Sequence, residues 1–177
     1  MRLVLLVVAI LGLCTCAAVA QTQIGQAVER PNFSGTWEFV GSGSNLRGRV
    51  LMIAHSGDEI VIEDRFVFEK KSYFNKTTLY ADKRGESNLI QIPGGDELTE
   101  IKSRTAWEKN KLVRRLQFDG MMEFQGQRYR QAINENQAYI LSEDGNTLTV
   151  RSNSRRETPF STTPLITSGK STFRRKS

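Results

Sequence analysis

Cysteine and histidine are scarce in this chain of 177 residues. Its two cysteines, Cys14 and Cys16, both lie among the first 20 residues, and His55 is the only histidine. Beyond the N-terminus the chain therefore has no disulfide, and the Cys/His clusters that usually hold zinc are excluded. The serines and threonines also lack the set of partners that activates a nucleophile. We expect no metal, no cofactor and no enzymatic activity, and we interpret His55 as a surface histidine beside a turn.

Long apolar runs are also missing, except at the N-terminus. Arg2 precedes an apolar stretch over residues 3–13, and residues 18–20 have the small-x-small pattern of a signal-peptidase site. The apolar stretch is short for a membrane span. We expect a signal peptide over residues 1–20, cleaved after Ala20, and a secreted or periplasmic protein without a transmembrane segment. Lipoprotein anchoring fits poorly, because a leucine and a threonine precede the two cysteines.

The chain has only a small excess of positive charge. The formal net charge is +6, and the basic residues are spread along the chain rather than gathered in one run. Dispersed charge of this kind favours a solvated surface over a polyanion site, so we expect no specific nucleic-acid partner. Residues 32–176 have the length of a single domain, which we expect to be monomeric and to follow a loose lead-in over residues 21–31.

Short runs of alternating apolar and polar residues, separated by Gly, Asp and Asn, dominate the rest of the chain. This texture predicts an all-β, antiparallel domain of nine or ten strands, of which residues 59–68 and 111–118 are clear examples. We expect at most one helical turn, at residues 134–138, and a Ser/Thr/Pro-rich loop over residues 155–169. Serial hairpins predict an up-and-down β-barrel, and a two-sheet β-sandwich is the alternative.

Three segments carry a family resemblance. The first is Phe33-Ser34-Gly35-Thr36-Trp37, the second is residues 105–113, and the third is residues 139–150 followed by Phe173-Arg174-Arg175. In order and spacing they resemble the lipocalin-like domains (calycin superfamily) of exported bacterial proteins. The resemblance covers about residues 32–176 and implies a barrel around a small ligand. It also implies that an arginine of the last strand packs across the tryptophan of the first.

The barrel-closing residues implied by this resemblance are Gly35, Trp37, and Arg174 or Arg175. A glycine at position 35 allows a positive φ where the chain enters the barrel. Trp37 supplies a large apolar plug whose indole N–H needs a partner. An arginine over its ring would add a cation–π contact worth about 0.5–2 kcal/mol.

Large, mostly apolar side chains on the later strands are candidates for a ligand site: Phe66, Phe68, Met122, Phe124, Tyr129 and Tyr139. Side chains of this kind line small-molecule sites, and they equally fill a barrel that is packed solid. Two functions follow. One is an exported lipocalin-like protein that binds a small hydrophobic or amphipathic ligand; the other is a non-enzymatic envelope or interaction module with a solid barrel. The sequons at Asn32 and Asn75 are interpreted as chance matches.

Overall fold

The structure is a computed structural model that describes residues 30–41, 48–93, 97–157 and 160–176. Within these ranges nothing is described of four side chains near one hairpin tip, those of residues 122–124 and 128. The expected signal peptide over residues 1–20 and nearly all of the expected lead-in over residues 21–31 lie outside the described residues.

Ten β-strands make up the described part of the chain, and no helix occurs in it. No described segment is therefore a helix long and apolar enough to cross a membrane. In chain order the strands are β1 (Gly35–Phe39), β2 (Val50–Ser56), β3 (Glu59–Phe68), β4 (Lys71–Tyr80), β5 (Asp82–Gln91), β6 (Leu98–Glu108), β7 (Lys111–Phe124), β8 (Gln127–Leu141), β9 (Thr147–Glu157) and β10 (Leu165–Arg175).

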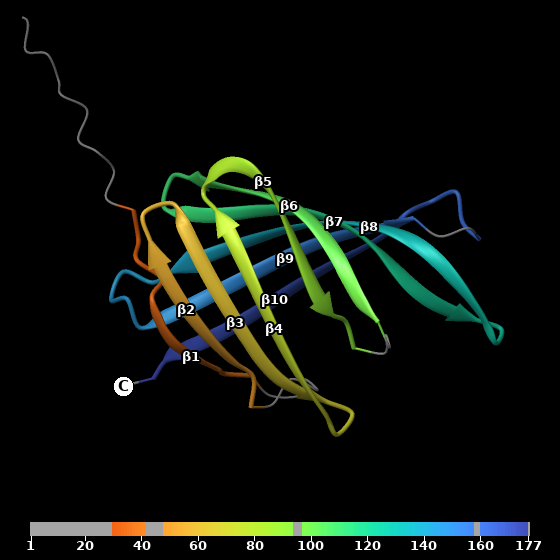
Figure 1. Cartoon of the computed structure of the whole chain (residues 1–177), viewed down its shortest axis with the longest axis horizontal. Helices are drawn as coiled ribbons and strands as arrows, with labels where there is room; N and C mark the ends of the chain where they lie inside the picture. The colour runs from red at the N-terminus through yellow and green to blue at the C-terminus, as the bar shows by residue number, and fades with distance from the viewer. Residues whose placement is uncertain (1–29, 42–47, 94–96, 158–159, 177) are drawn as a thin grey trace, which may run out of the picture.

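All ten strands belong to one antiparallel sheet that curls into a nearly closed barrel (Figure 1). Its order is β4-β3-β2-β1-β10-β9-β8-β7-β6-β5, so every hydrogen-bonded pair is consecutive in the chain except β1 with β10. The first and last strands therefore lie side by side in the same wall. The predicted all-β barrel is confirmed, and its single sheet distinguishes it from the alternative sandwich.

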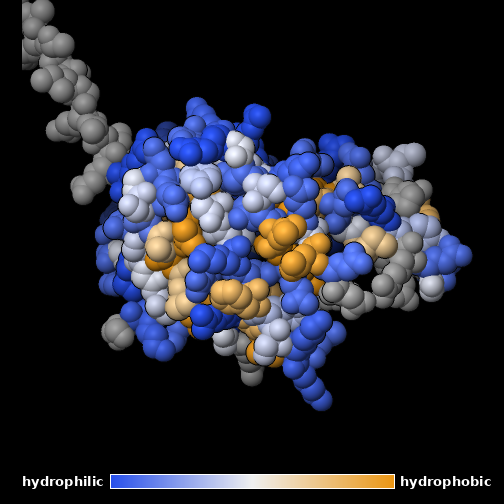
Figure 2. All heavy atoms as spheres, viewed as in Figure 1, coloured by the Kyte–Doolittle hydropathy of each residue, from blue (hydrophilic) through white to orange (hydrophobic). Residues whose placement is uncertain are grey.

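Alternation along the strands separates the inside of the barrel from the outside. In β3, Ile60, Ile62 and Phe66 are buried, whereas Arg65 and Val67 are exposed. The outer surface is mostly hydrophilic in the view of Figure 2, with smaller apolar patches. The apolar core gathers at one end of the barrel: Phe33, Trp37, Leu51, Ile53, Ile60, Ile62, Leu79, Ala81, Leu112, Tyr139, Leu148 and Phe173.

Two local predictions are wrong for the same reason. Residues 134–138 lie inside β8 rather than in a helical turn, and residues 155–169 contain the end of β9 and the start of β10 rather than one loop. In β8 the inward Glu135 and Gln137 are as polar as the outward Asn134 and Asn136. Without a hydrophobic side the strand gives no alternating signal.

The barrel has a seam between β4 and β5. These strands follow each other directly, yet no backbone ladder joins them in the described part of the chain. Side-chain amides bridge the gap instead. Asn75 Nδ2 donates to the Gln91 carbonyl at 3.1 Å and its Oδ1 accepts from the Gln91 N–H at 2.8 Å. Asn88 makes the equivalent pair of bonds with the Thr78 N–H at 2.7 Å and carbonyl at 3.1 Å.

Replacing Asn88 by alanine should open this seam locally. The Thr78 N–H and carbonyl would each lose their amide partner, which costs about 1–3 kcal/mol for a group that stays buried. We expect faster exchange of the Thr78 amide hydrogen with solvent, measured by NMR or mass spectrometry. Asn153→Ala, at an exposed position on β9, is the matched control. Unchanged protection of Thr78 in the Asn88 variant would contradict a seam held by amides.

Candidate functional site

The closed end of the barrel is built around Trp37, which has no exposed surface. Its indole N–H donates to the Phe33 carbonyl at 2.9 Å, and the Arg175 guanidinium lies 4.3 Å from the ring centroid. Arg175 also donates to the carbonyls of Ser34 at 2.5 Å and Gly145 at 2.9 Å. The arginine across the tryptophan is thus Arg175.

Neighbouring positions explain why this contact is so close. Arg174 is exposed, and its backbone register pairs it with Glu38 on the outer side of β1. Gly35 has a φ of +138°, and a Cβ at this position would lie 2.6 Å from Arg175 Nη1. A side chain at position 35 would therefore displace the guanidinium. These residues lie together where the first and last strands pair.

Residues 30–34 cross the closed end and complete it. The Phe33 ring, 1% exposed, stacks on Trp107 at 5.7 Å between centroids and lies 6.0 Å from the His55 ring. His55 Nδ1 accepts from the Phe33 N–H at 3.3 Å, and Nε2 lies 3.1 Å from the Gly57 carbonyl. His55 is therefore a half-buried residue near the end of β2 that positions this segment, and its expected place beside a turn is confirmed by the Gly57–Asp58 turn.

Beyond this core the barrel interior holds a cavity of about 360 Å³. One part of its wall is apolar, with Leu51, Ile62, Ile90, Val150 and Phe173. The other part is polar and charged: Arg49, Asp64, Asn75, Thr77, Arg114, Glu135, Gln137, Tyr139, Ser152 and Ser171. The volume falls in the lower part of the range of small-molecule sites.

Two of these charges neutralise each other directly. Arg49 Nε and Nη2 donate to the two carboxylate oxygens of Asp64 at 2.9 and 2.6 Å. The same guanidinium lies over the rings of Phe66, at 5.5 Å, and Phe173, at 5.8 Å. A bidentate pair held between aromatic rings is fixed in place, so it shapes the cavity rather than offering free donors.

Arg114 differs because no carboxylate of the described chain lies within 4 Å of it. It is 5% exposed, and its Nε donates to Ser103 Oγ at 3.0 Å. Ser103 in turn donates to Glu86 Oε1 at 3.0 Å, so a hydroxyl separates the buried guanidinium from the buried carboxylate. Arg114 Nη2 is buried and has no hydrogen-bond partner among the described residues. A buried charged donor without a partner is costly, and a ligand acceptor would relieve that cost.

Tyr139 lies on the strand next to Arg114 and presents a neutral hydroxyl. It donates to Gln137 Oε1 at 3.0 Å, and Gln137 Nε2 donates to Glu135 Oε1 at 2.8 Å. Burial raises the pKa of Tyr139 above its ordinary value, so the phenol stays protonated at neutral pH. Apart from the Arg49–Asp64 pair, the polar part of the wall therefore combines one cation, Arg114, one carboxylate, Glu135, and neutral groups that both donate and accept.

The predicted ligand residues are dispersed. Tyr139 lines the cavity, whereas Phe66 is buried and stacks on Tyr73 at 5.1 Å. Phe68 is half-buried at the end of β3, and Tyr129 packs edge-on against Phe160, 4.3 Å between ring centroids. The side chains at positions 122 and 124 (Met122 and Phe124) lie outside the described set.

Sequence reasoning missed the charged residues of the interior, Arg49, Asp64 and Arg114. Asp64 carries a usable signal, because it has the same parity as the buried Ile60 and Ile62 within one strand. A charge on the apolar side of a strand marks an inward polar group.

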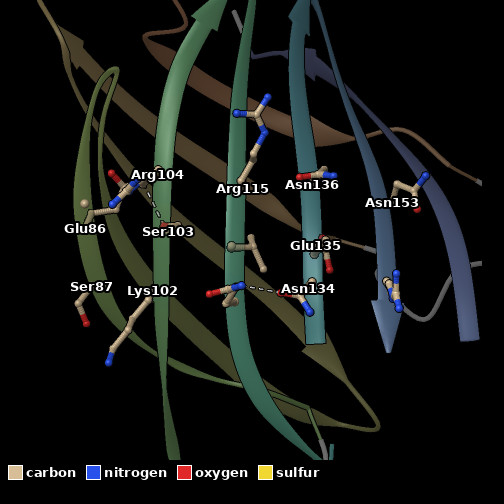
Figure 3. A pocket seen from close by; sticks show the side chains of 14 residues that line it. Glu86, Ser87, Lys102, Ser103, Arg104, Arg115, Asn134, Glu135, Asn136 and Asn153 are labelled. Atoms are coloured by element: carbon tan, nitrogen blue, oxygen red, sulfur yellow. Dashed lines mark hydrogen bonds between the residues drawn. The ribbon is translucent and has the colours of Figure 1, made fainter. Parts of the chain in front are cut away.

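A second hollow of about 930 Å³ lies on the outside, across β5 to β9 (Figure 3). Its wall carries the side chains of Lys102, Arg104 and Arg115 on β6 and β7, with amides on the neighbouring β8 and β9. The four cations in its lining, with Arg155 as the fourth, come from three different strands. This hollow is separate from the barrel interior because outward and inward residues alternate along each strand.

Comparison with known proteins adds no assignment, since no protein-family model and no curated protein matches the chain. Within the described ranges no group of three or more His, Cys, Asp or Glu side chains is arranged to hold a metal ion.

Proposed function

We propose that this chain is an exported, non-enzymatic, lipocalin-like protein that binds a small amphipathic molecule inside its barrel. The observation that carries the proposal is the buried Arg114 Nη2, which lacks a partner in the described structure and belongs to a residue lining a half-apolar cavity. Support for export comes from the signal-peptide pattern of residues 1–20.

The two kinds of wall define the ligand class. Leu51, Ile62 and Phe173 offer an apolar surface to a hydrocarbon or ring system. Arg114 Nη2, which has no partner among the described residues, offers a donor to an acceptor group such as a carboxylate, sulfonate or carbonyl oxygen. The Tyr139 hydroxyl already donates its proton to Gln137 and can only accept. A wholly apolar ligand would leave Arg114 Nη2 buried without a partner, which disfavours such a ligand by the cost of an unsatisfied charged donor. The ligand therefore has one polar end.

Arg114→Gln should weaken binding of an amphipathic anion. We use 8-anilinonaphthalene-1-sulfonate as the probe, because it joins a ring system to a sulfonate. Loss of one charge-assisted hydrogen bond costs about 1.5–3 kcal/mol, so the Kd from fluorescence titration should rise by about 10- to 100-fold. Arg115→Gln, one residue further along β7, is the control, because Arg115 faces outward and should leave the Kd unchanged.

Native mass spectrometry of protein purified from its own host tests the function itself. A retained small molecule with an apolar body and an acceptor head group is the expected result. Failure of the unaltered protein to bind the probe, together with no retained molecule, would contradict the proposal. Equal Kd values for the two arginine variants would show that Arg114 does not contact the ligand. Thermal melting of both variants separates loss of binding from loss of folding.

A further inference from the structure

The outer face of β6 to β10 contains two pairs of like charges set directly opposite each other. Arg104 on β6 is the register partner of Arg115 on β7. Arg151 on β9 is the register partner of Lys170 on β10. Like charges in directly opposed positions destabilise a sheet, so each pair costs stability in the free protein. Two such pairs on one face indicate that these charges have a role other than stabilising the sheet.

Few carboxylates compensate these charges. Arg115 pairs with Glu108 at 2.7 Å, with both side chains well exposed to solvent. Arg104, Arg151 and Lys170 are exposed, and no carboxylate of the described chain forms an ion pair with them within 4 Å. An exposed ion pair such as the one made by Arg115 is worth little, and an incoming anion can replace it.

Neutral amides fill the space between the two charged pairs. Asn136 and Asn153 on β8 and β9 lie in the same cross-strand row as Arg104 and Arg115. Gln117 and Asn134 form the next row and hydrogen-bond each other at 2.8 Å. Together these side chains form the wall of the 930 Å³ outer hollow (Figure 3). Each amide both donates and accepts, which matches the hydroxyl groups of a sugar.

We propose that this outer face binds an acidic polysaccharide, a chain of sugars that carries carboxylate or sulfate groups. The cations neutralise the acidic groups, and the amides between them bond the sugar hydroxyls. Adjacent strands are about 4.8 Å apart, so β7 and β9 are about 10 Å apart, and Arg151 is offset from the row of Arg115 by two residues along β9. An extended polymer lying across the strands would meet both charged pairs. This binding is independent of the barrel interior and goes beyond the proposed function.

Other polyanions fit this face less well. No aromatic residue lines the outer hollow, so nucleic-acid bases would find no stacking platform there. The hollow is lined almost entirely by polar side chains and lacks the apolar and aromatic groups that enter a lipid surface. The combination of guanidinium and amide groups therefore favours a hydroxylated polymer.

The test measures retention of the mature chain by polyuronate, dextran sulfate, uncharged dextran and a single-stranded oligodeoxynucleotide. We compare Arg104→Gln/Arg151→Gln with the control Lys70→Gln/Lys71→Gln, which removes the same charge from exposed positions at the β3–β4 hairpin, away from the outer hollow. We expect the first variant to bind one of the acidic polymers at least about fivefold more weakly. The slope of log K against log[salt] should fall in magnitude by about 1–2. The control should change by less than about twofold.

A stability measurement separates this result from misfolding. Because each substitution in the first variant removes one member of a like-charge pair, its melting temperature should stay equal or rise. Equal losses in the two variants would show that only net charge matters and would overturn the proposal. Stronger binding of the oligonucleotide than of either acidic polymer, or equal binding of uncharged dextran, would overturn it as well. None of these outcomes depends on Arg114 or on the cavity.

Discussion

Replacing Phe33 by alanine is expected to destabilise the protein by about 3–5 kcal/mol, the usual cost of deleting a buried aromatic ring. Phe33 is 1% exposed and joins the segment that crosses the closed end to the Trp107 and His55 rings. Its carbonyl also accepts the indole N–H of Trp37. Without the ring the covering segment would lose its main apolar anchor, and the barrel would open at this end.

Tryptophan fluorescence is the natural measurement for this variant. The chain has two tryptophans, and both Trp37 and Trp107 contact Phe33. We expect a lower urea midpoint and a red shift of the native emission as water reaches both indoles. Phe33→Leu, which keeps most of the apolar volume, should cost less than about 1.5 kcal/mol. A loss below 1 kcal/mol in the alanine variant would show that the segment does not hold the closed end together.

Arg175→Ala should cost about 3–5 kcal/mol. The guanidinium donates to two carbonyls, those of Ser34 and Gly145, and covers the Trp37 ring. Hydrogen bonds from a charged group contribute about 1.5–3 kcal/mol each, and a cation–π contact about 0.5–2 kcal/mol. One side chain thereby links the first strand, the β8–β9 turn and the segment before β1.

The neighbouring Arg174→Ala is the matched control for this variant. Arg174 is exposed on the opposite side of the same strand and should change the free energy of unfolding by no more than about 0.5 kcal/mol. Thermal melting of the two variants should therefore differ by roughly 10 °C for a domain of this size. Similar melting temperatures would show that the Arg175 contacts are replaced by solvent at little cost.

The sequence predicted best those strands that border the apolar core. Residues 59–68 were predicted as a strand and form β3 with the same bounds, because Ile60 and Ile62 alternate with more exposed neighbours. The motif around Gly35 and Trp37 likewise lies where the chain enters the barrel. In both places one side of the strand faces hydrophobic groups, so apolar and polar residues alternate along the sequence.

Prediction failed where the barrel interior is polar. β8 passes the cavity with Glu135 and Gln137 facing inward, and β9 does so with Ser152 and Ser154. A strand between polar solvent and a polar cavity has no hydrophobic side. Its sequence therefore resembles that of a turn or loop. The strand predicted over residues 111–118 therefore ends before β7 does, at Phe124.

The same effect hid the candidate site. Ligand residues were sought among aromatic and methionine side chains, on the expectation of an apolar interior. Arg114 carries the same signal as Asp64, because it has the parity of Leu112 and Leu116, which are buried in the same strand. The pairing of β7 with β6 sets Arg114 beside Thr105 and near Ser103, which agrees with this alternation.

Carbohydrate attached to Asn75 and a sealed barrel exclude each other. Asn75 heads the sequon Asn75-Lys76-Thr77, yet its side-chain nitrogen donates to the Gln91 carbonyl and the residue is 9% exposed. A glycosyltransferase that modifies this nitrogen during synthesis would remove one of the bonds across the β4–β5 seam and place a bulky sugar there. A eukaryotic secretory host would then yield two populations, one glycosylated with a gap in its wall and one unmodified and closed, from a single gene.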